Sequence, residues 1–128
     1  MQITREPAAD AHAIVACLAG EVRLRDARYT RSVIVTRDAI VADWRHPPVG
    51  QLAIAHFAAL VELAPEIVLL GTGARLQLPP PELYAAFAAH GIGLEAMDNA
   101  AACRTYNLLL SEYRAVAVAL MLEAASAT

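Results

Sequence analysis

The first third of the chain alternates short apolar runs with polar and glycine-containing breaks. The runs cover residues 12–17, 21–24, 29–36 and 39–44. Short runs between turn residues predict β-strands joined by tight turns. Residues 33–35 are all β-branched, which is typical of a strand covered on both faces, whereas residues 21–24 alternate as a half-exposed strand does. The strand pattern ends at Pro47-Pro48.

Beyond this point the pattern predicts helices that alternate with strands. Apolar residues at helical spacing predict a helix over residues 52–63. A second helix is expected to begin at Pro79–Pro81 and to end at Gly91. Short apolar segments predict strands at residues 67–70 and 92–97.

The last part of the sequence predicts a third helix and a closing strand. Asp98 or Asn99 can cap the helix, and its buried face is predicted by an apolar stripe of Ala102, Tyr106, Leu109 and Tyr113. Residues 115–122 predict a strand, because the valines among them disfavour helix. Continuation of the third helix is the alternative, because alanine and leucine favour helix.

This order of elements is typical of the α/β class. We expect a three-layer domain with a mixed central β-sheet, packed helices and an N-terminal β layer. No repeat or linker divides the sequence, so residues 1–128 are predicted as a single domain, with residues 1–11 as a loosely ordered N-terminal segment.

Composition removes several classes of function. Hydrophobic residues make up 58% of the chain, the net charge is −3, and all 10 residues counted as Lys+Arg are arginines. Without lysine, a Walker-type phosphate lysine, a Schiff base and a lysine general base are excluded. The acid excess and the lack of an arginine cluster predict that the protein has no nucleic-acid partner.

The sequence also predicts a cytoplasmic protein. Cys17 and Cys103 lie far apart in the sequence, and the first ten residues lack the apolar core of a signal peptide. The longest uncharged stretch, residues 46–61, contains Pro47-Pro48, so no membrane span is expected. Abundant alanine and arginine without lysine are typical of a GC-rich bacterial genome.

A glycine turn follows the predicted strand at residues 67–70. The backbone N–H groups of Gly71, Thr72 and Gly73 could face a ligand at the carboxyl edge of the sheet. A dinucleotide motif would need a third glycine where Leu76 stands, and a phosphate loop would need lysine, so both nucleotide motifs fail. We favour a structural turn, because glycine after a strand is common for backbone reasons, and a ligand-binding loop is the alternative.

The segment from Met97 to Asn107 holds the densest group of polar side chains. Cys103 and Asn107 are four residues apart and share a helical face, while Arg104 and Thr105 turn to a neighbouring face. The helix dipole and Arg104 could lower the pKa of the Cys103 thiol and make it a nucleophile. The preceding alanines and the lack of a local histidine favour a small buried core residue instead.

Charged and histidine side chains complete neither a catalytic nor a metal motif. Arg104 and Arg114 lie near acidic residues, which predicts internal ion pairs, with an anion site facing residues 71–73 as the alternative. The acidic residues concerned are Glu95, Asp98 and Glu112. The histidines have no metal-type spacing, so neither a metal nor a cofactor is predicted.

Several motifs in a fixed order make the chain similar to a known family. They are Ile67-Val-Leu-Leu-Gly-Thr-Gly73, Pro79–Pro81, Gly91-Ile-Gly-Leu-Glu-Ala-Met-Asp98 and Ala102-Cys-Arg-Thr-Tyr-Asn107, followed by Glu112 and Arg114. This combination resembles an uncharacterised α/β domain family that includes a mitochondrial respiratory complex I (NADH dehydrogenase) assembly factor. The resemblance covers nearly the whole chain. It departs from the family pattern at Asn99, where threonine is usual, and at Tyr113, where glycine is usual.

The resemblance implies a three-layer α/β fold without an established catalytic activity, and therefore no catalytic residues. It supplies no agreed site, so we mark the residues that match its motifs as the predicted ligand or partner surface. That surface consists of Gly71, Thr72, Gly73, Met97, Asp98, Cys103, Arg104, Thr105, Tyr106 and Asn107.

Two functions are predicted from these observations. The first is a non-enzymatic binding or assembly-assisting domain with a protein partner, which the resemblance connects with the assembly of membrane-bound respiratory complexes. The alternative is a small-molecule or anion-binding domain, or an unrecognised enzyme, that uses the turn at residues 71–73 and the helix start at residues 98–107. The high apolar content also predicts a homodimer as an alternative assembly.

Overall fold

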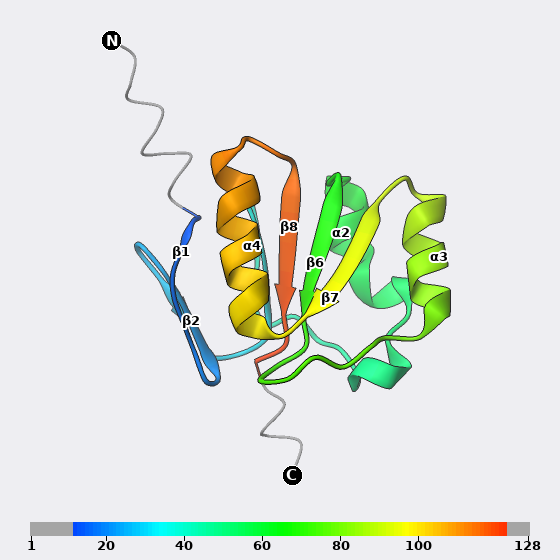
Figure 1. The fold of residues 1–128 in the computed structure, drawn as a ribbon, viewed down its shortest axis with the longest axis horizontal. Helices are drawn as coiled ribbons and strands as arrows, with labels where there is room; N and C mark the ends of the chain where they lie inside the picture. The colour runs from blue at the N-terminus through cyan, green and yellow to red at the C-terminus, as the bar shows by residue number, and fades with distance from the viewer. Residues whose placement is uncertain (1–11, 123–128) are drawn as a thin grey trace.

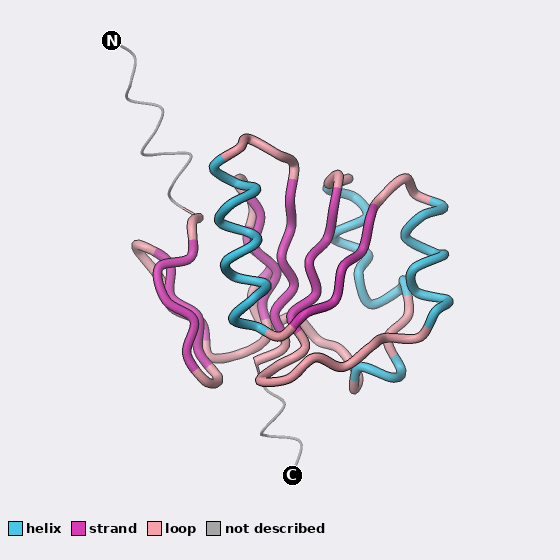
Figure 2. Tube along the Cα trace, in the orientation of Figure 1, coloured by secondary structure: helices cyan, strands magenta, loops and turns pink. Residues whose placement is uncertain are grey.

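The structure is a computed structural model that describes residues 12–122. The predicted N-terminal segment, residues 1–11, lies outside the described residues. The described part combines a small antiparallel sheet, a larger mixed sheet and three α-helices (Figures 1 and 2). The predicted α/β class, with its N-terminal β layer, is confirmed.

The small sheet contains strands β1 (Ile14–Leu18), β2 (Glu21–Leu24) and β3 (Arg28–Tyr29), paired antiparallel in that order. Gly20 lies in the turn between β1 and β2 with φ of +71°, a left-handed conformation that favours glycine. Val22 and Leu24 are buried while Arg23 between them is exposed. The predicted half-exposed strand is therefore confirmed, and its apolar side faces the core.

The larger sheet has the strand order β5-β4-β8-β6-β7. Its strands are β4 (Val33–Thr36), β5 (Ile40–Val41), β6 (Ile67–Gly71), β7 (Gly93–Met97) and β8 (Val116–Leu120). β6 pairs in parallel with β7 and β8, whereas β4 is antiparallel to both β5 and β8. The carboxyl ends of three parallel strands therefore meet at one edge, which is where open α/β sheets bind ligands.

Helices cover both faces of the larger sheet and complete three layers (Figure 1). On one face, α4 (Asn99–Ser111) lies beside the small sheet, and on the other lie α2 (Ala58–Leu63) and α3 (Pro81–Ala89). Two short 3-10 helices, η1 (Val49–Gln51) and η2 (Ile54–Phe57), precede α2. Within residues 12–122, no helix has the length and apolarity needed to cross a membrane.

The side chains of β6 point alternately to the two faces of the sheet and contribute to the core on both. Val68 and Leu70 pack in the cluster that contains Phe57 and Phe87. Leu69, between them, packs in the cluster that contains α4 and the small sheet. Because successive side chains of a strand point to opposite faces, this one buried strand holds both outer layers against the sheet.

Two of the predicted N-terminal elements are wrong in extent, and so is the first helix. The run at residues 29–36 divides into β3 and β4, because the first pairs with β2 and the second with β5 and β8, in different sheets. The run at residues 39–44 forms only the two-residue β5. The helix predicted over residues 52–63 is α-helical only from Ala58, with 3-10 geometry before it.

The closing segment is a strand, so the predicted strand is confirmed and the helical alternative is wrong. α4 ends at Ser111, and Tyr113 adopts a left-handed conformation with φ of +61° that turns the chain out of the helix. β8 then lies between β4 and β6, and all five of its residues are buried. A continuous apolar run is typical of such a central strand.

Candidate functional site

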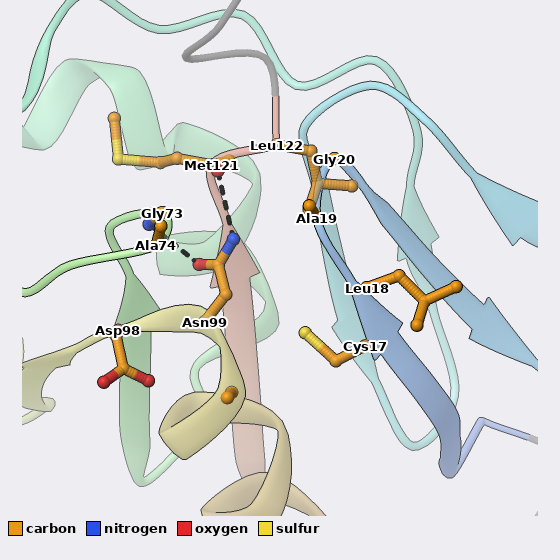
Figure 3. Close-up of a pocket in the computed structure, with 11 residues that line it drawn as sticks. Cys17, Leu18, Ala19, Gly20, Gly73, Ala74, Asp98, Asn99, Met121 and Leu122 are labelled. Carbon is orange, nitrogen blue, oxygen red and sulfur yellow. Dashed lines mark hydrogen bonds between the residues drawn. The ribbon is translucent and has the colours of Figure 1, made fainter.

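A pocket of about 480 Å³ lies at the carboxyl ends of the three parallel strands (Figure 3). Its walls are formed by four segments: the β1–β2 turn, the turn after β6, the first turn of α4 and the end of β8. The lining residues are Cys17, Leu18, Ala19, Gly20, Gly73, Ala74, Asp98, Asn99, Ala100, Met121 and Leu122. Most of these residues are apolar, and Asp98 is the one charged residue among them.

The glycine turn after β6 uses its polar groups within the protein. The Thr72 N–H donates to the Met97 carbonyl at 2.9 Å, which continues the pairing of β6 with β7. The Thr72 hydroxyl donates to the Arg75 carbonyl at 2.7 Å and accepts from the Gln77 N–H at 3.0 Å. Gly73 has φ of +104°, which only glycine adopts readily. These contacts give the turn the structural role that we favoured from the sequence.

Asn99 joins this turn to the end of β8. Its Oδ1 accepts from the Gly73 N–H at 3.0 Å, and its Nδ2 donates to the Met121 carbonyl at 3.2 Å (Figure 3). The space for Asn99 exists because residue 71 is glycine: a Cβ there would collide with the Asn99 amide oxygen and the Leu120 side chain. Asn99 therefore holds two strand ends together from the start of α4. The sequence identifies it only as a candidate helix cap and as a departure from the family pattern.

Asp98 is the residue that caps α4. Its Oδ1 accepts from the Ala101 N–H at 2.8 Å, and its backbone is extended, as expected for an N-cap. Figure 3 shows its carboxylate directed away from Cys17. The single charge on the pocket wall is thus bound to the helix, and the pocket presents a mostly apolar surface.

Cys103 is buried in the core between α4 and the small sheet. Burial raises the pKa of its thiol above the ordinary value, and the nearby Cys17 thiol raises this pKa further, so that the opposing effect of Arg104 is outweighed. The predicted buried core residue is confirmed. A thiol pKa lowered by the helix dipole is wrong, because desolvation has the larger effect.

Tyr106 and Asn107 hold the N-terminal residues against α4. The Tyr106 hydroxyl donates to the His12 carbonyl at 3.0 Å. The Asn107 side chain accepts from the Ile14 N–H and donates to the Ile14 carbonyl, both at 2.8 Å. A carboxamide that bonds both the N–H and the carbonyl of one residue pairs with it as a neighbouring strand does. Asn107 therefore docks β1 onto the helix.

The remaining predicted site residues lie apart from the pocket. Arg104 is exposed, Thr105 is half-buried, and Met97 packs partly against the core. Arg114 forms its ion pair with Glu66, at 3.0 Å, rather than with the nearer acidic residues that we predicted. The strand order explains this correction, because the residues just before β6 and β8 lie side by side.

Ser32 contributes to the same edge of the sheet and was missed as a site residue. Its side chain is fully buried, and its Oγ accepts from the Leu122 N–H at 2.9 Å. The Nε2 atom of His46 lies 2.8 Å from the same oxygen. No sequence signal pairs Ser32 with Leu122, because 90 residues separate them.

The matched motif residues therefore separate into distinct groups. Gly73 and Asp98 line the pocket, and Gly71 and Thr72 lie behind its wall. The three residues at 103, 106 and 107 face the small sheet. Among residues 12–122, no three His, Cys, Asp or Glu side chains are grouped closely enough to hold a metal ion.

Fold and site together define a class: a small α/β domain whose parallel strands end at a mostly apolar pocket. A family model matches residues 14–121, and its description is "Protein of unknown function (DUF498/DUF598)". The chain belongs to this family. The predicted resemblance is confirmed, since relatives of the chain include a complex I assembly factor.

Similar proteins include two curated relatives and several solved structures. The 13 kDa major membrane protein of Francisella tularensis subsp. holarctica (strain LVS) is 40% identical over 62 residues, covering 48% of this chain and 50% of that protein. NADH dehydrogenase [ubiquinone] 1 alpha subcomplex assembly factor 3 of Xenopus tropicalis is 39% identical over 56 residues, covering 44% of this chain and 31% of that protein. The chain thus spans half or less of these relatives. The NMR structure of a Xanthomonas campestris protein is 41% identical, with a TM-score of 0.81 over 95% of this chain and 92% of that one.

Proposed function

We propose that the protein is a non-enzymatic binding domain that assists the assembly of a membrane-bound respiratory complex by holding a protein partner. The observation that carries the proposal is the apolar edge, by which we mean the pocket together with Leu76 and Leu78. Similarity to an assembly factor of NADH dehydrogenase supports the kind of partner.

The polar groups at this edge favour binding over chemistry. Asp98 bonds a helix N–H, Asn99 bonds one N–H and one carbonyl of the backbone, and the Thr72 hydroxyl bonds a second carbonyl. Groups held in this way fix the shape of the edge, and they need not rearrange when a partner covers it. What the edge offers to a partner is shape and apolar surface.

The loop after β6 adds exposed apolar side chains to the pocket. Leu76 is 53% exposed and Leu78 is 70% exposed. The loop begins at Gly73 and Ala74, which line the pocket, and runs along the same end of the molecule to α3 (Figure 1). Exposed leucines on a loop that begins at the pocket favour a protein partner that covers them, because burying each leucine contributes about 1.5–3 kcal/mol.

Site-specific photo-crosslinking in the native cells tests the proposal. A benzophenone amino acid is placed at Leu78, and in a matched control at Leu108, which is 57% exposed on α4. We expect the probe at Leu78 to crosslink the same protein in repeated experiments and the probe at Leu108 not to do so. Identical products from both positions, or none from Leu78, would contradict the proposal.

The same crosslinks distinguish a homodimer from a different partner. A product from Leu78 that joins two copies of this chain would identify self-association and contradict a heterologous partner. We also propose a cytoplasmic location, which is the setting that the sequence predicts.

A small apolar ligand is the second candidate occupant of the pocket. The volume of the pocket and its place at the carboxyl ends of parallel strands favour this alternative. Asp98 is the one charged residue that lines the pocket, and it is acidic. The pocket therefore suits an apolar molecule better than the anion that the sequence analysis gives as an alternative ligand. A thermal shift that saturates with an apolar metabolite, and disappears in Ala100→Trp, would support this candidate over a protein partner.

A further inference from the structure

The two thiols of the chain lie in the same cluster, where β1 packs against α4. The sequence contains 2 cysteines, and both are free. Cys17 lies on β1 and Cys103 on α4, 86 positions away in the sequence, yet the two thiols lie near enough for Cys17 to raise the pKa of Cys103. Both belong to the cluster that packs the small sheet against the helix.

The docking of β1 explains why the thiols come together. Asn107 bonds both backbone groups of Ile14 and so fixes the start of β1 against α4. Cys103 lies one helical turn before Asn107 on the same face, and Cys17 lies three residues after Ile14. The strand and the helix run in opposite directions, and a bulge between Ile14 and Ala16 lets Cys17 face the same cluster as Ile14. These offsets therefore bring the two cysteines near each other.

The two thiols differ in their access to solvent. Cys17 is half-buried and lines the pocket, and Figure 3 shows its sulfur directed from β1 toward the first turn of α4. Cys103 is buried and is not among the pocket residues. A reagent that enters the pocket therefore meets Cys17 and not the buried Cys103.

We propose that Cys17 is a thiol–disulfide exchange site and that Cys103 is its resolving thiol, so that a small-molecule disulfide converts the pair into a bond between β1 and α4. The Cys17 thiolate attacks one sulfur of the small disulfide, whose S–S bond breaks and releases one thiolate. Cys103 then loses its proton to solvent and attacks the Cys17 sulfur of the mixed disulfide, which releases the second thiolate. The two cysteines are oxidised by two electrons, and the small disulfide is reduced to two thiols.

This reaction links the small sheet covalently to the helix. It also removes a free thiol from the wall of the pocket, so it changes the surface on which the proposed partner binds. The inference does not depend on that proposed function, because the thiol contact and the pocket are properties of this chain alone. The new bond closes a long loop, which limits the unfolded chain and raises the melting temperature.

Mass spectrometry of the full chain treated with oxidised glutathione tests the proposal. We expect the wild type to lose two hydrogens and to carry no glutathione, and trypsin to release residues 6–23 joined to residues 76–104. Cys103→Ala should keep one glutathione on Cys17, and Cys17→Ala should remain unmodified. Since the thiol pKa of Cys103 is raised, closure should speed up about tenfold for each pH unit across the neutral range.

Three results would overturn the proposal. They are a stable glutathione adduct on Cys17 of the wild type, disulfides that join different copies of the chain, and no reaction at either cysteine. If Cys103→Ala does not fold, the linked peptides from the wild type decide the question alone. Dithiothreitol should restore both free thiols and return the melting temperature to its starting value.

Discussion

Removing the Asn107 side chain should loosen the small sheet without unfolding the larger one. Asn107→Ala deletes two hydrogen bonds of 2.8 Å to the backbone of Ile14, a buried residue. Leaving such groups without partners costs about 1–3 kcal/mol. If the free energy of opening the small sheet falls by about 2 kcal/mol, the equilibrium constant for opening rises roughly 30-fold, since about 1.4 kcal/mol is a factor of ten.

Hydrogen exchange measured by mass spectrometry reports this opening for each strand separately. We expect faster exchange in residues 12–24 and unchanged exchange in β6 and β8, because their pairing does not involve Asn107. Asn107→Asp should lie between alanine and wild type, since the carboxylate accepts from the Ile14 N–H but cannot donate to its carbonyl. Leu108→Ala, at the exposed neighbouring position, is the control. Equal acceleration in both sheets, or no change in β1, would refute the reasoning.

Three further predictions concern the edge of the larger sheet and its ion pair. Gly71→Ala should destabilise the protein by about 1–3 kcal/mol in urea unfolding, because the new methyl group displaces Asn99; unchanged stability would show that the contact relaxes freely. Asp98→Ala should cost about 1 kcal/mol through loss of the helix cap, and Asp98→Asn should recover most of it. Arg114 lowers the pKa of Glu66, so their pair stabilises the fold above the ordinary glutamate pKa and is lost as pH falls through the lowered value. Glu66→Gln should therefore be less stable than wild type at neutral pH, with the difference vanishing in acid.

The elements predicted from the sequence follow from local interactions. The strand at β6, the helix that begins with the prolines, the Asp98 cap and the burial of Cys103 each depend on residues within a few positions of one another. Periodicity and capping chemistry carry this information directly. For that reason the order of elements and the α/β class were predictable, even though the ends of several elements were not.

The contacts that were not predictable join residues distant in the sequence. Asn107 meets Ile14 across 93 positions, and Ser32 meets Leu122 across 90. In each case one polar side chain bonds the backbone of a distant segment, and such a pair produces no periodic pattern in the sequence. The division of residues 29–36 has the same origin, because it depends on which sheet each half joins.

These contacts also change the meaning of the motif from Cys103 to Asn107. In the sequence it is the densest group of polar side chains, with a nucleophilic Cys103 only as the alternative, and in the structure its core-facing side chains dock the small sheet onto α4. Asn99 and Thr72 have a similar structural role at the glycine turn. The apolar edge beside them is the surface that we propose for a partner.

Affinity for the crosslinked partner, measured by isothermal titration with the purified proteins, tests this central claim most directly. The account predicts that Leu76→Ser combined with Leu78→Ser weakens binding by at least about tenfold, because two exposed leucines lose their buried contacts. Leu108→Ser, with comparable exposure on α4, should bind as the wild type does. Equal affinity for all three proteins would contradict the claim that the apolar edge is the binding surface.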